Sequence, residues 1–71
     1  MRTIEVPENG TTIYRVIRRR SRKLRAYTWH VRRVTMTDDL IAVYVRDAGK
    51  DVFLSEVAAE FEAARRRMDA C

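Results

Sequence analysis

The dipeptide Asn9-Gly10 limits the fold of this chain more than any other feature, because it forms the preferred two-residue turn of a β-hairpin. Both residues tolerate the positive φ angles that this turn requires. The segments on its two sides alternate apolar and polar residues, so we expect residues 3–7 to pair with the strand that follows, with Val6 opposite Ile13. Pro7 has no backbone N–H to donate, and the first strand is therefore predicted to lie at an edge of the sheet.

Two longer segments also have the composition of β-strands. Residues 12–19 and 24–36 are rich in β-branched and aromatic side chains. In the second segment, alternate positions up to Val31 share one face, whereas Val34 falls on the opposite face. This change of phase predicts either a β-bulge at residues 32–33 or a strand that is covered on both faces.

A fourth strand is predicted for residues 40–46. Their sequence, Leu-Ile-Ala-Val-Tyr-Val-Arg, is apolar almost throughout, which is typical of a strand that is central in a sheet or covered on both faces. The polar residues Thr37-Asp38-Asp39 before it have the composition of a turn.

The C-terminal segment has the periodicity of a helix. Its apolar residues recur at spacings of three and four and form one stripe: Leu54, Val57, Phe61, Ala64 and Met68. Ser55 is the predicted N-cap, and Asp51 is the alternative that would start the helix one turn earlier. Acidic residues fill the early turns and residues 65–67 are arginines, an order that complements the helix dipole. We expect the stripe to dock on the sheet; the alternative is a helix that binds in the groove of a partner.

Together these segments predict an α+β fold, in which a small antiparallel four-stranded meander sheet (ββββ) is followed by one C-terminal helix packed on one face. Residues 1–71 are expected to form a single domain. One helix covers only one face of such a sheet, and an uncovered apolar face tends to become an interface. This predicts a homodimer or a protein partner, with Tyr14, Val16 and Tyr44 as candidate interface residues.

Basic residues are concentrated in one part of the chain. Nine of its 15 Lys and Arg residues lie between Asn9 and Thr37, where the sequence has no Asp or Glu. The nine are Arg15, Arg18, Arg19, Arg20, Arg22, Lys23, Arg25, Arg32 and Arg33. The formal net charge of the whole chain is +5, so the remainder is mildly acidic. Because a guanidinium group donates two parallel hydrogen bonds to phosphate or carboxylate, this segment predicts a surface that binds an anionic partner.

Two functions of different classes fit such a surface. The first is binding to the backbone of nucleic acid, DNA or RNA, because dense arginine on a β-hairpin is the usual electrostatic footprint of such proteins. The second is a small regulator or inhibitor of the kind that phages and mobile elements encode, similar in size and type to anti-CRISPR proteins. Its basic residues would bind an acidic or nucleic-acid-binding surface of a protein complex. Both functions require the nine side chains to converge on one positive surface; a solvated basic face is the third interpretation.

The sequence contains no arrangement that is typical of an enzyme or a cofactor site. His30 is the only histidine, has no acid near it in the sequence, and is interpreted as a strand residue. Tyr27 and Trp29 are interpreted as part of the sheet's core rather than as base-stacking platforms. Two glycines do not make a Gly-rich phosphate loop, and Cys71, the only cysteine, has no partner for an internal disulfide. We therefore expect a non-enzymatic protein without metal or cofactor.

The expected location follows from the apolar segments. The chain has no apolar run of about 18 residues, so no membrane span is predicted. Its first residues lack the apolar stretch of a signal peptide. These features predict a cytoplasmic protein, where a single free thiol is ordinary.

Overall fold

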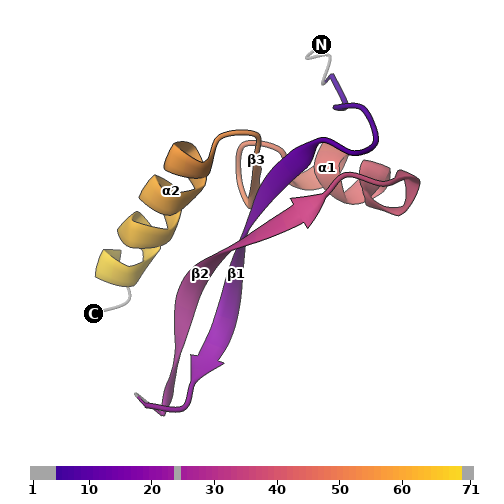
Figure 1. Ribbon diagram of the computed structural model, residues 1–71. Helices are drawn as coiled ribbons and strands as arrows, with labels where there is room; N and C mark the ends of the chain where they lie inside the picture. Colours follow the sequence, from indigo (N-terminus) through magenta and orange to yellow (C-terminus); the bar gives the residue numbers. More distant parts are fainter. Residues whose placement is uncertain (1–4, 24, 70–71) are drawn as a thin grey trace.

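A long, twisted β-hairpin is the main element of the structure, a computed structural model that describes residues 5–23 and 25–69 (Figure 1). The elements follow in the order β1 (Thr12–Ser21), β2 (Ala26–Thr35), the 3-10 helix η1 (Asp38–Leu40), α1 (Ile41–Asp47), β3 (Val52–Phe53) and α2 (Glu56–Asp69). The strands form one antiparallel sheet in the order β2-β1-β3. The α+β class is therefore confirmed, but the chain has a three-stranded sheet and two helices instead of four strands and one helix.

The pairing of β1 with β2 is continuous, from Thr12 opposite Thr35 to Ser21 opposite Ala26. The two strands therefore have no β-bulge, and the second predicted alternative holds, because each face of β2 is covered in part. We call the two sides of the sheet the α1 face and the α2 face, after the helix that packs on each. Side chains alternate between them along each strand. The α1 face carries Ile13, Arg15, Ile17 and Arg19 of β1 with Thr28, His30, Arg32 and Val34 of β2.

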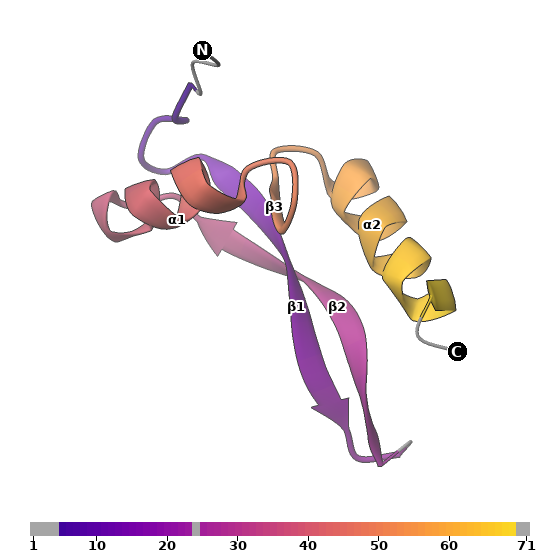
Figure 2. The same cartoon turned by 180° about the vertical axis from the view of Figure 1, so that it is seen from behind.

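Two small hydrophobic cores lie on opposite sides of the sheet. The core on the α1 face contains the buried side chains of Ile13, Met36, Tyr44 and Val52. The core on the α2 face contains Val16, Ala59 and Ala63, with Tyr14, Trp29, Val31 and Phe53 packed against them. The short strand β3 contributes one side chain to each core, because its two side chains point to opposite faces. The two helices lie on opposite sides of the hairpin, so both faces of the hairpin are covered only near β3 (Figure 2).

Residues 40–46 were predicted as a strand, and this prediction is wrong, because most of them form α1. Only Tyr44 of the helix is buried, whereas Ile41 and Val45, one turn apart, are 40% and 46% exposed. An apolar run of this length is ambiguous between a strand and a helix segment. Asp38 and Asp39 lie in the first turn of η1, directly before α1, where negative charge stabilises the start of a helix.

The N-terminal hairpin is also absent from the described residues. Asn9-Gly10 does form a turn, in which the Thr11 N–H donates to the Glu8 carbonyl oxygen at 3.1 Å and Gly10 has a φ of 92°. The turn joins the end of β2 instead of a preceding strand: the Gly10 N–H donates to the Met36 carbonyl oxygen at 2.9 Å. Residues 5–8 are not a strand, and the first part of the predicted strand, residues 3–4, lies outside the described residues. The free edge of β1 is taken by β3.

Helix α2 presents the opposite face to the sheet from the one predicted. Ala59 and Ala63 are fully buried against the sheet, whereas Val57, Phe61 and Met68 of the apolar stripe are 79%, 73% and 77% exposed. The reason lies on the sheet, where aromatic rings already fill the space under the helix and leave room only for small side chains. The start of the helix is as predicted, because the Ala58 N–H donates to Ser55 Oγ at 3.3 Å.

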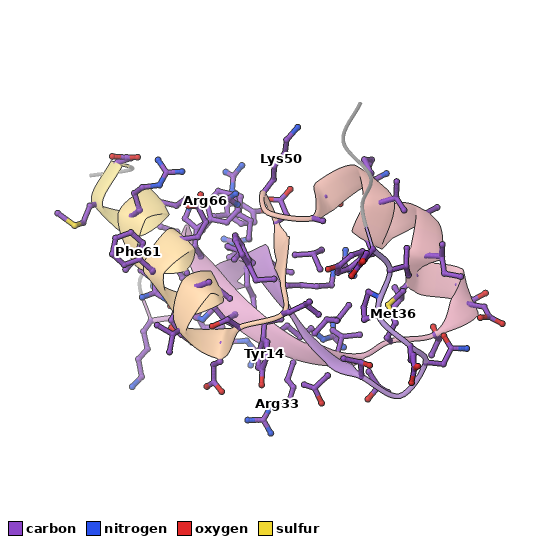
Figure 3. The ribbon with its side chains drawn as sticks, turned by 90° about the horizontal axis from the view of Figure 1, so that it is seen from above. Tyr14, Arg33, Met36, Lys50, Phe61 and Arg66 are labelled. Carbon is purple, nitrogen blue, oxygen red and sulfur yellow. The ribbon has the colours of Figure 1, made fainter. Side chains whose placement is uncertain are left out.

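This orientation of α2 also changes the predicted interface. Val16 and Tyr44 are 4% and 6% exposed, each within one of the two cores, and Tyr14 packs against the core on the α2 face (Figure 3). The three residues do not form an uncovered apolar surface.

Two arginines connect α2 to the rest of the chain, and one of them, Arg67, donates through Nε to the Trp29 carbonyl oxygen at 2.9 Å. The Arg66 guanidinium lies 4.8 Å from the centroid of the Trp29 ring and donates to the Lys50 carbonyl oxygen at 2.9 Å. It also pairs with Asp51 at 2.7 Å and with Glu62 at 2.9 Å (Figure 3). A planar, charged group that satisfies several partners at once fixes both the rotation and the position of the helix.

Acidification is expected to weaken this contact through Glu62. Hydrogen bonds from Arg65 and then Arg66 hold the pKa of Glu62 below its usual value of 4.5. A carboxylate whose pKa is lowered in the folded state contributes stability above its ordinary pKa and loses it as the pH falls through the folded value. The Glu62→Gln variant should therefore melt at a lower temperature than the parent at about pH 7, and the difference should shrink at about pH 3. An equal difference at both pH values, measured by thermal unfolding, would contradict the assignment.

Candidate functional site

All nine basic residues of the predicted segment lie on the β1–β2 hairpin. The strands carry Arg15, Arg18, Arg19, Arg20, Arg32 and Arg33, and the tip carries Arg22, Lys23 and Arg25. We call the hairpin from residue 15 to residue 33 the arm. Its distal half projects beyond both helices (Figures 1 and 2). At the tip, Arg25 adopts a φ of 49°, in the left-handed region that a tight reversal of the chain uses.

The arm is basic on both of its faces, which differs from the single positive surface that was predicted. Arg15, Arg19 and Arg32 lie on the α1 face. Arg18, Arg20 and Arg33 lie on the α2 face. This division follows from the alternation of side chains along a strand and from the unbroken register. The charged surface is thus a narrow basic ribbon and not a flat patch.

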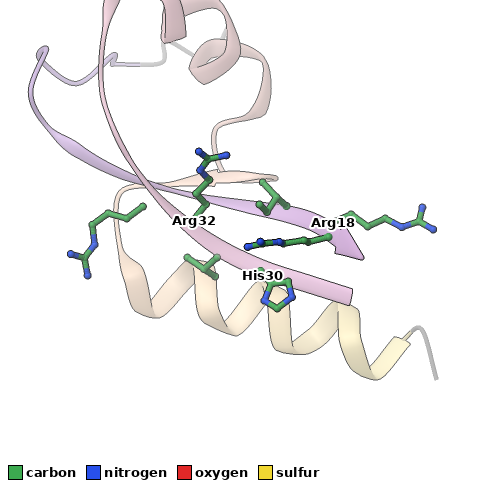
Figure 4. A pocket seen from close by; sticks show the side chains of 7 residues that line it. Arg18, His30 and Arg32 are labelled. Atoms are coloured by element: carbon green, nitrogen blue, oxygen red, sulfur yellow. The ribbon is translucent and has the colours of Figure 1, made fainter. Parts of the chain in front are cut away.

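The arm contains an open depression beyond α1 that is lined by residues of both faces (Figure 4). Its volume is about 700 Å³, and it is lined by Ile17, Arg18, Arg19, His30, Val31, Arg32 and Arg33. Ile17 lies directly opposite His30, and Arg15 directly opposite Arg32. Like charges on directly opposed positions of a sheet repel each other. An anion placed between them would remove that repulsion.

The charge of the arm is not neutralised by the chain's own carboxylates. Among the described residues, none of the nine basic side chains forms an ion pair. The acidic residues near the arm pair with other residues. Asp47 accepts hydrogen bonds from Arg46, and these lower the pKa of Asp47. The positive charge of Arg15 adds to that lowering of the pKa without forming an ion pair. Asp51 and Glu62 pair with Arg66. The arm therefore carries a concentrated positive potential toward the solvent.

The two aromatic residues of the arm have different environments. Trp29 is half-buried in the core on the α2 face, beneath Arg66, as predicted. Tyr27 was predicted to belong to the core, but it is 60% exposed, and the Arg18 guanidinium lies 4.6 Å from the centroid of its ring. The stacked Tyr27–Arg18 pair holds one guanidinium plane in place near the tip of the arm.

Sequence reasoning missed three residues that line the depression: Ile17, His30 and Val31. His30 was interpreted as an ordinary strand residue, yet the register places His30 and Ile17 between Arg19 and Arg32. The alternation of residues 24–36 already places His30 and Arg32 on the same face of the predicted strand. It could be used only once the pairing partner of each position was known.

The chemistry of the arm is that of anion binding: exposed guanidinium groups offer paired N–H donors and positive charge. None of the helices in the described part of the chain has the length and the apolar content needed to cross a membrane. No protein-family model, no curated protein and no solved structure matches this chain.

Proposed function

We propose that this chain is a non-enzymatic nucleic-acid-binding protein whose arm contacts the sugar-phosphate backbone. The observation that carries the proposal is the arm itself, which has nine positive charges and no acid between residues 15 and 33. Because none of these side chains is paired within the described residues, each can donate to an external anion. The cytoplasm is the compartment that we propose for such a protein.

The distribution of charge over both faces supports insertion of the arm into a groove. A two-stranded β-ribbon fits the major groove of B-DNA, which is about 12 Å wide. The two rims of a groove are phosphate backbones, so a ribbon with Arg19 on one face and Arg20 on the other can contact both rims at once. A flat basic patch would contact one backbone only. The phosphates would also relieve the repulsion between Arg15 and Arg32.

Sequence preference is expected to be weak. Arginines on the two faces of the ribbon are long enough to reach the phosphates, and phosphate contacts carry no sequence information. Beside the depression, Thr28 and His30 of the α1 face add two side chains that could meet base edges, of which His30 lines the depression itself. These are few compared with the nine basic residues, so backbone contacts should dominate the affinity.

The salt dependence of binding tests this proposal. Neutralisation of about six phosphates predicts a slope of about −5 in a plot of log K against log salt concentration. Fluorescence anisotropy with labelled mixed-sequence duplexes of DNA and of RNA, at several salt concentrations, measures that slope. A flat response, or no binding to either duplex at low salt, would contradict the proposal. If a stoichiometric protein complex formed under conditions in which neither duplex binds, the arm would instead serve the regulator or inhibitor function.

A further inference from the structure

The outer face of α2, continued by Leu54 just before the helix, is apolar and exposed. We call the residues of this face the outer stripe: Leu54, Val57, Phe61, Ala64 and Met68. The four large side chains are 54%, 79%, 73% and 77% exposed in chain order. Figure 3 shows Phe61 on the side of α2 away from the sheet, whereas Arg66 lies toward it. A contiguous apolar patch on so small a protein marks an interaction surface.

We infer that the outer stripe packs against α2 of a second copy of this chain, with the two helices antiparallel about a two-fold axis between Phe61 and Ala64. This inference does not depend on nucleic-acid binding, because the arm and the outer stripe use different residues. A two-fold interface is formed by the same surface on both copies, and that surface must therefore be complementary to itself. Side-chain size and charge along α2 both meet this requirement.

Side-chain size matches across the proposed axis. Equal distances from the midpoint of the stripe place Phe61 opposite Ala64 of the second copy, and Val57 opposite its Met68. Each layer then combines a larger with a smaller side chain, which is how the facing positions of two helices fill space without clash. A parallel arrangement would set Phe61 against Phe61 and leave a gap between the two Ala64 residues.

Charge along α2 also favours the antiparallel arrangement. The first half of the helix carries Glu56, Glu60 and Glu62, and residues 65–67 are arginines. Antiparallel helices place the acidic half of one copy beside the basic half of the other, whereas parallel helices place like charges together. Glu60 and Arg67 are seven residues apart, so they lie on the same flank of the stripe. The two-fold axis places each Glu60 in the positive field of the basic half of the other copy, while Arg67 Nε keeps its hydrogen bond to the Trp29 carbonyl oxygen of its own chain at 2.9 Å.

The size of this interface sets the expected strength. A helix of 14 residues is about 21 Å long, and two such helices in contact bury an area at the low end of specific interfaces, below about 1,200 Å². We therefore expect a dissociation constant of about 1–100 µM. The dimer should persist at high salt, because its centre is apolar and salt screens only the flanking charges.

Sedimentation velocity on the whole chain, over a concentration series from about 1 to about 500 µM, tests for this dimer. The parent protein should change from monomer to dimer within this range, and Phe61→Asp should stay monomeric throughout. Ile41→Asp is the matched control, because Ile41 is a comparably apolar residue, 40% exposed on α1. It should dimerise like the parent. A parent chain that stays monomeric, or a Phe61→Asp variant that still dimerises, would overturn the inference.

Disulfide trapping tests the orientation of the two helices. In a Cys71→Ser background, Val57→Cys and Met68→Cys proteins are mixed and oxidised. The two positions are about 16 Å apart along the helix, so antiparallel helices bring position 57 near position 68 of the other copy and keep identical positions apart. We expect predominantly mixed 57–68 crosslinks. Predominantly 57–57 and 68–68 crosslinks would show a parallel dimer and overturn the proposed arrangement.

Discussion

Replacement of Arg19, Arg20 and Arg22 by alanine is expected to weaken binding to duplex DNA or RNA by about 1,000-fold at about 0.1 M salt, because each lost phosphate contact removes close to tenfold under these conditions. The three side chains are exposed, lie on both faces and the tip of the arm, and make no ion pair within the described residues. Their removal should therefore leave the fold intact. The slope of log K against log salt should become shallower by about 2.7.

A matched control separates the arm from net charge. The Arg46→Ala, Lys50→Ala, Arg65→Ala variant removes the same three charges from the formal net charge of +5, but from exposed positions outside the arm. Its affinity should fall by less than about tenfold, because only the long-range field is reduced. Equal losses in the two triple variants would mean that binding follows the net charge of the chain and not the arm. Circular dichroism of both variants checks that the fold is retained.

The second large effect concerns the orientation of α2. Ala63→Leu should lower the free energy of unfolding by about 1–3 kcal/mol, because Ala63 is fully buried against the sheet and the added side chain has no space there. This corresponds to a melting temperature lower by about 10 °C for a chain of this size. Phe61→Ser should change the free energy of unfolding of the monomer by less than about 0.5 kcal/mol, because Phe61 is 73% exposed.

Thermal unfolding at a concentration at which the protein is monomeric measures both variants. If α2 docked through its large apolar residues, the order would be reversed: Phe61→Ser would lose about 3 kcal/mol or more, and Ala63→Leu would be tolerated. The sign of the difference between the two variants therefore decides which face of the helix meets the sheet. Both substitutions lie in the middle of the same helix, two residues apart, so helix propensity alone cannot produce the expected difference.

The sequence predicts the hairpin well because its signals are local. Alternation in residues 12–19 and 24–36, together with a run of charged residues between them, defines two strands and a tip without knowledge of any distant contact. The Asn9-Gly10 turn was located for the same reason. Its partner was not, because the choice between an N-terminal strand and β3 as the second neighbour of β1 depends on tertiary contacts such as the Val16 N–H donating to the Asp51 carbonyl oxygen at 2.8 Å.

Two of the incorrect predictions share a physical cause. Apolar periodicity shows which side chains of a helix share a face. Which face of the helix packs on the sheet depends on the space that the side chains of the sheet leave. Phe61 is excluded from the interior because Tyr14, Trp29 and Phe53 already occupy the α2 face of the sheet. Similarly, residues 40–46 are apolar enough for a buried strand, yet the small core on the α1 face has room for Tyr44 and not for the whole run.

For the candidate site, the sequence identifies the nine basic residues but not how they are divided between the two faces. That division requires the register, which places Arg19 and Arg20 on opposite sides of the ribbon. It also places Arg15 beside Arg32, a repulsive contact that cannot be seen from residues 17 positions apart in the chain. The sequence alone therefore locates the arm. The strand pairing is needed to show that its basic residues lie on both faces, which is the arrangement that suits a nucleic-acid groove.

The most direct measurement of the central claim is an NMR titration of the ¹⁵N-labelled chain with a short mixed-sequence duplex at low salt. The account predicts that backbone amide shifts change along residues 15–33, most strongly near the tip, while the amides on the outer face of α2 stay in place. Shifts confined to α1 or α2, or no shifts at duplex concentrations well above those of the protein, would contradict a nucleic-acid-binding arm.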